Sequence, residues 1–219
     1  GTISDFSKKI WGSSLEAVQN ILKDPVIRNL GIYVILFTML MTISWMISLG
    51  IVQEWSQDPC ERTGFFARIE QIVTPLTLIM QLFLASYILR RIGSLAVLSI
   101  YGFLFGIAFL AYAFYPTITT VMMVVITLRI FEYGLNKPTR ESIYTKLKQQ
   151  DRYKSTVFID TFLARSGDVI GGWFVRGLVG TGIAVLSVTW AALPFAMLIS
   201  FMGFQISKST NHEWWIHKD

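Results

Sequence analysis

Charged side chains that could bind a ligand are concentrated between residues 129 and 176. In that stretch acidic and basic residues are interleaved with apolar ones, whereas elsewhere the charges cluster between long uncharged runs. The candidate site residues of the stretch are Arg129, Glu132, Lys137, Asp160, Arg165 and Asp168. Arginine and lysine hold anionic oxygens, and carboxylates neutralise them in ion pairs. The pattern therefore indicates either a substrate-binding cluster or a structural network of charges.

Residues that could support enzyme chemistry are few. His212 and His217 lie in the tail HEWWIHKD, without a metal-binding partner at a recognised spacing. The sequence holds no serine, cysteine or glycine-rich motif typical of a nucleophile or a phosphate-binding loop. Trp214 and Trp215 are typical of anchors at a membrane surface. We therefore expect a protein that is not an enzyme, with no catalytic residue, no metal and no cofactor.

The composition places these charges in a membrane protein. Hydrophobic residues make up 53% of the chain and charged residues 15%, and the mean hydropathy is +0.53. So few charges cannot solvate the surface of a soluble domain of this size. The formal net charge of +5 is then explained by the excess of Lys and Arg in the loops on one side of the membrane. We therefore expect no nucleic-acid partner. The single cysteine, Cys60, excludes an internal disulfide.

Six long apolar runs predict six transmembrane helices in an all-α fold. About 20 apolar residues cross the hydrocarbon layer as a helix, with every backbone polar group bonded inside the segment. The predicted spans are 29–53, 71–89, 94–114, 117–134, 155–180 and 183–204. Together they form a six-helix bundle over residues 29–204. Residues 54–70 read as a polar, turn-forming loop.

The flanking segments and one internal loop predict interfacial structure. Apolar residues recur near helical spacing over residues 1–28, which predicts an amphipathic helix at headgroup level, and an ordinary solvated helix fits the same pattern equally well. A second short surface helix is expected over 136–148, with Arg140 on its polar face. Residues 205–219 are expected to form a tail on the cytoplasmic side. The absence of an initiator Met predicts a processed chain or a piece of a longer one.

The basic residues predict the orientation of the bundle. With six spans both termini share a side, and that side collects most of the lysines and arginines. The opposite loops hold only Arg62 and Arg68, with acids beside them. The positive-inside rule therefore places the termini and the 134–155 loop on the cytoplasmic side or its organellar equivalent. We expect a multi-pass protein of a bacterial inner membrane or an organellar inner membrane.

Ionisable groups inside the fourth and fifth predicted spans are costly. Each costs about 2.5 to 3.5 kcal/mol on insertion, so such groups pair and face a protein interior or a wet cavity. One reading is a fixed network that pairs Arg129 with Glu132 or Asp160, and Arg165 with Asp168. The other reading is a substrate site. Both readings stay open at this point.

Small and uncharged polar residues add to this picture. Gly167, Gly171 and Gly172 thin one face of the fifth span, so that a neighbouring helix or a ligand can approach closely. Gly102 and Gly106 do the same in the third span. In the second span the strongest polar group at mid-depth is Gln81.

Several motifs resemble one family of carriers. They are the run R-x-x-E-Y-G-x-N-K-P-x-R-E from Arg129, followed by R-Y-K, F-I-D and R-S-G-D-x-x-G-G. Together with QLFLASYILRRIG and ILKDPVIRNLGIYVILF, they resemble the second half of major facilitator superfamily transporters of the ATP/ADP translocase, or nucleotide exchanger, type. The resemblance covers about residues 22–204.

The resemblance implies a six-helix half of a twelve-helix alternating-access carrier. It implies a second six-helix half as partner, or another membrane protein or a homodimer, together with lipids and a nucleotide or organic anion. The positions that match the family pattern are Arg129, Glu132, Lys137, Arg140, Glu141, Tyr153, Lys154, Asp160, Arg165, Gly167 and Asp168. The alternative is a transporter-derived structural subunit of a larger membrane complex without transport activity.

Overall fold

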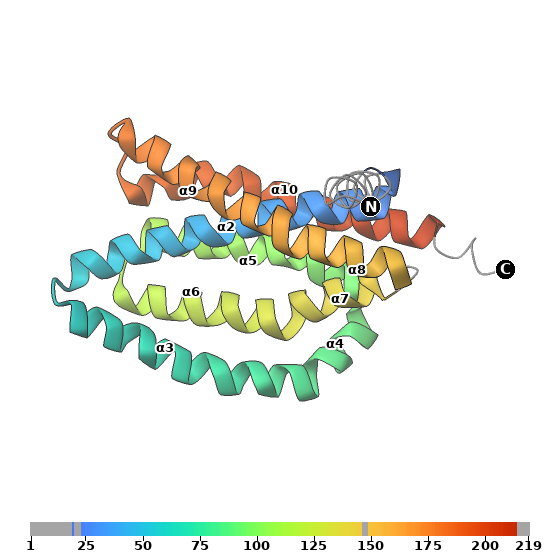
Figure 1. Cartoon of the computed structure of the whole chain (residues 1–219). Helices are drawn as coiled ribbons and strands as arrows, with labels where there is room; N and C mark the ends of the chain where they lie inside the picture. The colour runs from blue at the N-terminus through green and yellow to red at the C-terminus, as the bar shows by residue number, and fades with distance from the viewer. Residues whose placement is uncertain (1–18, 20–22, 146–148, 214–219) are drawn as a thin grey trace, which may run out of the picture.

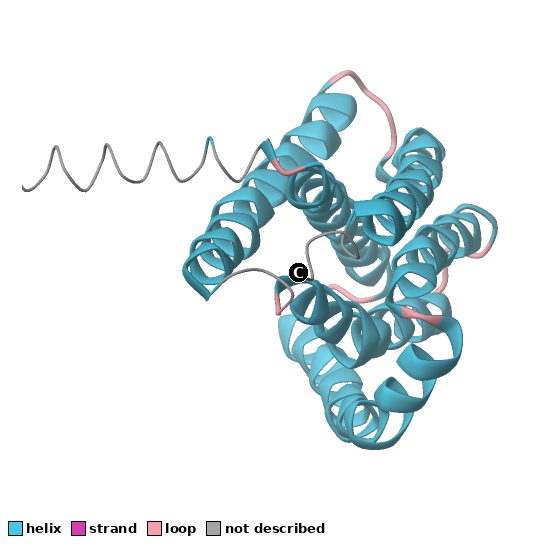
Figure 2. Ribbon diagram, turned by 90° about the vertical axis from the view of Figure 1, so that its right-hand side faces the viewer, coloured by secondary structure: helices cyan, strands magenta, loops and turns pink. Residues whose placement is uncertain are grey.

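The computed structural model of the chain describes residue 19 and residues 23–145 and 149–213. This part is helical almost throughout and contains no strand, which confirms the all-α prediction (Figure 2). The predicted interfacial helix over 1–28 lies almost wholly outside the described residues, and so do residues 214–219 of the tail.

The first three long helical rods cover residues 25–114. The first rod is α2 (Pro25–Trp55), and the third is α5 (Ser94–Phe114). The second rod is continuous through α3 (Pro59–Ile79), the π-helical segment η1 (Met80–Leu84) and α4 (Ala85–Ile92). Asp58 caps this rod through the Cys60 amide, so the rod begins well before residue 71. The prediction of a loop over 54–70 is therefore wrong beyond residue 58.

The last three rods cover residues 118–213. The fourth runs through α6 (Ile118–Phe131), the π-helical η2 (Glu132–Asn136) and α7 (Lys137–Tyr144). The fifth runs through α8 (Gln149–Val157), the π-helical η3 (Phe158–Leu163) and α9 (Ala164–Gly180). A turn with Gly182 at φ 90° leads through the short 3-10 helix η4 (Val185–Ser187) into α10 (Val188–Glu213).

The segment after residue 136 differs from its predicted surface helix. In the structure α7 continues the fourth rod directly, and Thr139, Arg140, Ile143 and Tyr144 are buried. Its exposed face carries Lys137 and Glu141 instead. The expectation that Arg140 lies on a polar surface is therefore wrong, because packing against other rods decided which face of α7 is covered.

The rods alternate in direction along the bundle, so α2 begins and α10 ends at the same end of it (Figure 1). Within the described residues five helices are long and apolar enough to cross a membrane, by length and composition. They are Pro25–Trp55, Pro59–Ile92, Ala96–Phe114, Ile118–Tyr144 and Val185–Ile206. The chain is thus a multi-pass membrane protein. The charged fifth rod is not among the five, so six spans remain a prediction.

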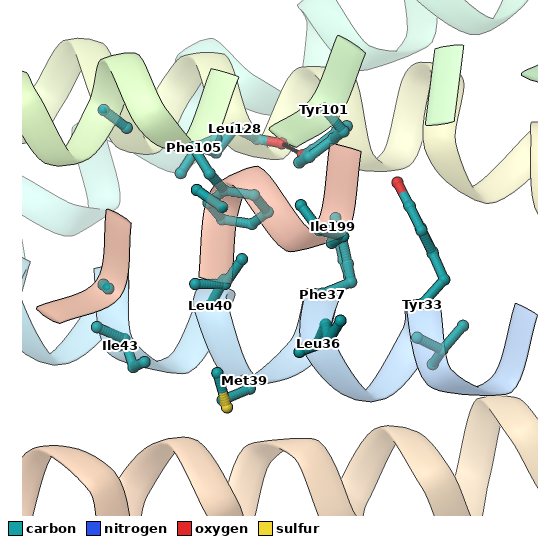
Figure 3. Packing of buried hydrophobic residues seen from close by; sticks show 14 of the residues in the cluster. Tyr33, Leu36, Phe37, Met39, Leu40, Ile43, Tyr101, Phe105, Leu128 and Ile199 are labelled. Carbon is teal, nitrogen blue, oxygen red and sulfur yellow. Dashed lines mark hydrogen bonds between the residues drawn. The ribbon is translucent and has the colours of Figure 1, made fainter. Parts of the chain in front are cut away.

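Helix α2 is the centre of the core. It packs against α9, α10, α6 and α5, and most of its length is buried. Aromatic side chains fill the contact with α5, where Phe37 lies edge-on to Tyr101 and Phe105 at ring-centroid distances of 4.9 and 5.7 Å (Figure 3). The Tyr33 hydroxyl donates to the Leu98 carbonyl at 3.0 Å. The buried hydroxyl is therefore satisfied, as low-dielectric packing requires.

Glycines set the closest approaches between rods. A Cβ on Gly102 of α5 would lie 2.6 Å from the Ala196 carbonyl oxygen of α10. On α9, a Cβ on Gly171 would lie 2.7 Å from the Met39 carbonyl oxygen of α2. Gly106 and Gly172 face open space, with no atom within 4 Å of such a Cβ. Gly102 and Gly171 therefore allow close helix packing, whereas the neighbouring Gly106 and Gly172, predicted to do the same, do not.

Cys60 tests the predicted topology directly. It is exposed at the start of α3, at the end of the bundle opposite the start of α2 and the end of α10 (Figure 1). In sealed vesicles we expect an impermeant maleimide to label Cys60 only from the side opposite a C-terminal tag. The Cys60→Ser variant is the blank. Labelling from the tagged side would refute the arrangement of the rods across the membrane.

Candidate functional site

Three groups of charged side chains lie within the rods. Each contains one arginine that pairs with at least one carboxylate from its own or a neighbouring rod. We call them the Arg140, Arg129 and Arg165 groups. All three lie on or beside α2, which therefore positions the whole candidate site.

The Arg140 group is the most buried of the three. The Arg140 guanidinium lies 3.3 Å from Asp160 of η3 and 3.9 Å from Glu132 of η2, and Arg140 as a whole is 7% exposed. Its Cζ lies 5.6 Å from the ring centroid of Phe37, a distance typical of a cation–π contact. The Tyr144 hydroxyl donates to Asp160 at 3.3 Å. This group ties the fourth and fifth rods to α2.

The Arg129 group joins the fourth rod to the second. Arg129 of α6 forms an ion pair with Glu70 of α3. Its Cζ also lies 5.6 Å from the ring centroid of Trp45 on α2. The predicted pairing of Arg129 with Glu132 or Asp160 is therefore wrong, because both of those acids pair with Arg140.

The Arg165 group confirms a predicted pair. Arg165 lies 3.4 Å from Asp168, three residues further along α9. Asp168 also accepts a hydrogen bond of 2.9 Å from the hydroxyl of Thr42 on α2. The Arg165 side chain is 82% exposed. The arginine of this pair thus lies on an uncovered side of the bundle, and within the described residues no ion pair joins Arg165 or Asp168 to the Arg129 or Arg140 groups.

Helix α2 brings the Arg129 and Arg165 groups to neighbouring positions. Trp45 lies beneath Arg129 and Thr42 contacts Asp168. Residues three apart are neighbours on a helix surface, with Cβ atoms about 5 to 6 Å apart. Both α2 residues remain partly or wholly exposed. We call this surface, with Thr42 and Trp45 as its floor and Arg129 and Asp168 on its walls, the α2 face.

Gln81 lies in a different contact, between two π-helical segments. Its side-chain amide donates to the Tyr133 carbonyl at 2.7 Å, which links η1 to η2. Next to it, Gly134 packs so tightly on Met80 that a Cβ would lie 2.9 Å from the Met80 Cβ. A π turn interrupts the regular helical hydrogen-bond pattern, and such turns are frequent at functional sites. Lys137 is exposed and forms no ion pair within the described residues.

One site residue was missed in the sequence, and another was placed wrongly. Glu70 falls in the segment 54–70 that reads as a loop, although Asp58 and Pro59 give the signal for a helix start. Arg140 was placed on the surface, although it follows Glu132 and Asn136 at four-residue steps. That spacing puts three polar groups on one helix face, and this signal favours a buried ladder.

No known protein family, curated protein or solved structure matches this chain at a significant level. The resemblance to ATP/ADP translocases therefore depends on the sequence motifs, and the major facilitator fold remains a prediction. Within the part of the chain that the structure describes, no group of three or more His, Cys, Asp or Glu side chains could hold a metal ion.

The charge balance limits what the site can bind. In the three groups three arginines are paired with four carboxylates, Glu70, Glu132, Asp160 and Asp168. A polyphosphate requires several cations that are not already neutralised. A nucleotide could therefore bind at the α2 face only if a partner supplied further cations or if these ion pairs exchanged.

Proposed function

We propose that this chain is one half of a membrane solute carrier, completed by a second six-helix half, another membrane protein or a second copy. One observation carries the proposal. Charged and hydrogen-bonding groups from α2, α3, α6 and α9 converge on a partly exposed face near the middle of the bundle. Ionisable groups at membrane depth lie against protein or a water-filled cavity and not against lipid.

The position of the α2 face supports a translocation cavity. Thr42 lies near the middle of α2, and Asp168 binds to it from α9. Carriers built from two halves bind their substrates near the bilayer midplane, between the halves. The α2 face then forms one wall of that cavity. In keeping with the resemblance to nucleotide exchangers, the substrate is a nucleotide or another organic anion, with the partner half supplying the cations that this half lacks.

Water access to the α2 face tests the proposal. Val169 is exposed on α9, four residues after Arg165 on the same face. In a Cys60→Ser background, we expect Val169→Cys to react with a small impermeant thiol reagent in native membranes, because a cavity holds water. A cysteine thiol must ionise to react, so one facing lipid reacts far more slowly.

Phe103→Cys is the matched control for this labelling. Phe103 is exposed on α5, and no charged residue lies within the α5 helix. We expect Val169→Cys to react at least about tenfold faster than Phe103→Cys. Equal, slow rates for both cysteines would mean that the α9 face meets lipid or a dry interface, and the carrier proposal would then be lost.

The second candidate function is a structural subunit of a larger membrane complex. The observation in its favour is that each arginine of the three groups already has a carboxylate partner. A neutralised network can lock helices together without any substrate. Uptake of labelled ATP or ADP by proteoliposomes that contain the chain and its co-purified partner distinguishes the carrier function from the structural one. Slow labelling of Val169→Cys together with an absence of uptake favours the structural subunit.

A further inference from the structure

The Arg140 group has one carboxylate more than it has cations. Arg140 lies between Asp160 and Glu132, and both acids come from π-helical segments of different rods. One guanidinium can neutralise only one carboxylate. Like charges that share a site disfavour each other's ionisation, and the cost is larger where water is scarce.

Glu132 is the carboxylate with the poorer pairing. Its nearest distance to Arg140 is 3.9 Å, too long for a direct hydrogen bond, whereas Asp160 lies at 3.3 Å. The Glu132 side chain is 17% exposed and that of Asp160 is 34% exposed. Asp160 also accepts from the Tyr144 hydroxyl. Glu132 is therefore the carboxylate of this group that lacks a close cation.

Asn136 provides an independent sign of a missing proton or ligand. Its side chain is 0% exposed, and among the described residues neither its Nδ2 nor its Oδ1 has a hydrogen-bond partner of normal geometry, although the Tyr33 side chain lies close by. It lies between Glu132 and Arg140 in the ladder of four-residue steps, and the Arg140 Nε atom is also unpartnered. A protonated carboxyl group gains a hydrogen-bond donor. The Asn136 Oδ1 atom offers that donor an acceptor on the same helix face.

Other charged and titratable groups near Glu132 do not remove the excess charge. They come from the fourth rod, α9, α2 and α5, and they are Arg129, Lys137, Arg140, Asp168, Tyr33 and Tyr101. Arg129 is neutralised by Glu70, and Asp168 pairs with Arg165. Lys137 also acts on Glu132, but it is exposed, so water screens its charge more than that of the buried Arg140.

We propose that Glu132 takes up one proton from water, and that the Arg140 group is thereby the coupling-ion site of the carrier. The proton adds to a carboxylate oxygen of Glu132, and the resulting O–H bond converts the group from net −1 to neutral. Binding and release of this proton change the contacts among η2, η3 and α2. Segment η2 continues α6 and η3 leads into α9, and these two helices carry Arg129 and Asp168, the walls of the α2 face. The coupling role depends on the proposed carrier function, whereas the proton site itself does not.

Infrared difference spectroscopy on the purified chain with its co-purified partner tests the site without transport. As the pH falls from about 8 to about 5.5, we expect a carboxylic-acid C=O band to appear, because a carboxyl that shares one cation with another ionises less readily. Glu132→Gln should lose this band. Asp160→Asn should lose it too, because Arg140 then neutralises Glu132 alone. Glu141→Gln, which changes an exposed acid on α7, should keep it.

Each outcome decides the proposal. A band that persists in Glu132→Gln, or one that survives in Asp160→Asn, would overturn it. So would wild-type protein that shows no such band and binds sodium at this group instead. If Glu132→Gln fails to fold, Asp160→Asn still tests whether the band comes from the two carboxylates that share Arg140. Uptake assays measure the carrier function separately. If Glu132 binds a proton but the protein transports nothing, the proposed carrier function is refuted, whereas the proton site is not.

Discussion

Replacing Arg140 with leucine is expected to lower the free energy of unfolding by about 3 to 5 kcal/mol. The change leaves Asp160 without its ion pair and removes the contact of the guanidinium with Phe37. Both losses occur in a region where Arg140 is buried, so little water replaces the lost partner. Unfolding of the purified protein by a denaturing detergent in mixed micelles measures the change.

Two variants serve as controls for the Arg140 prediction. Arg165→Leu removes an arginine whose side chain is 82% exposed, so it should cost no more than about 1 kcal/mol. Combining Arg140→Leu with Glu132→Gln and Asp160→Asn should recover part of the loss, because no unpaired charge is then left behind. An Arg140→Leu cost no larger than that of Arg165→Leu would show that the Arg140 group does not hold the rods together.

Alanine at Gly102 or Gly171 is expected to lower the free energy of unfolding by about 1 to 3 kcal/mol each. The new Cβ would meet backbone atoms: the Ala196 carbonyl oxygen at 2.6 Å for Gly102, and the Met39 carbonyl oxygen at 2.7 Å for Gly171. Backbone atoms cannot swing aside as a flexible side chain can, so the helices must move apart. The same detergent titration measures this loss.

The neighbouring glycines give matched controls on the same two helices. Gly106→Ala and Gly172→Ala place a Cβ in open space. They should be neutral, or they should stabilise the protein by up to about 1 kcal/mol, because alanine favours a helix over glycine. If Gly102→Ala behaved like Gly106→Ala, the close contact of α5 with α10 would be disproved.

The sequence predicts most of the helical architecture because charges are rare in membrane spans. The run from Ser94 to Phe114 holds no charge, and α5 occupies those same residues. The first span is also confirmed, with α2 extending slightly beyond 29–53 at both ends. The second span was predicted to begin too late, since the acidic and basic residues before Gln71 hide a helix that begins at Pro59.

The pairing of charges could be predicted only where the partners lie close in sequence. Arg165 and Asp168 are three residues apart on one helix, and their ion pair is confirmed. The partners of Arg129 and Arg140 lie on other rods, and hydrophobic periodicity carries no information on which rods become neighbours. The π-helical segments were equally hidden, because a single wide turn leaves no clear signal in a sequence.

The π-helical segment Glu132–Asn136 determines how this chain should be aligned with any homologue. Arg129 and Arg140 are eleven positions apart, and at about 100° per residue an unbroken α-helix would bring them onto the same face. The wide turn separates them, so that Arg129 meets Glu70 while Arg140 meets Asp160. A homologue with one residue fewer in this segment and an unbroken α-helix would keep the second arginine on the face it has here, because ten α-helical steps leave it about 80° from the first. A one-residue gap in this segment would therefore preserve the partners of both arginines, whereas a homologue of equal spacing without the wide turn would rotate the second arginine by about 100°.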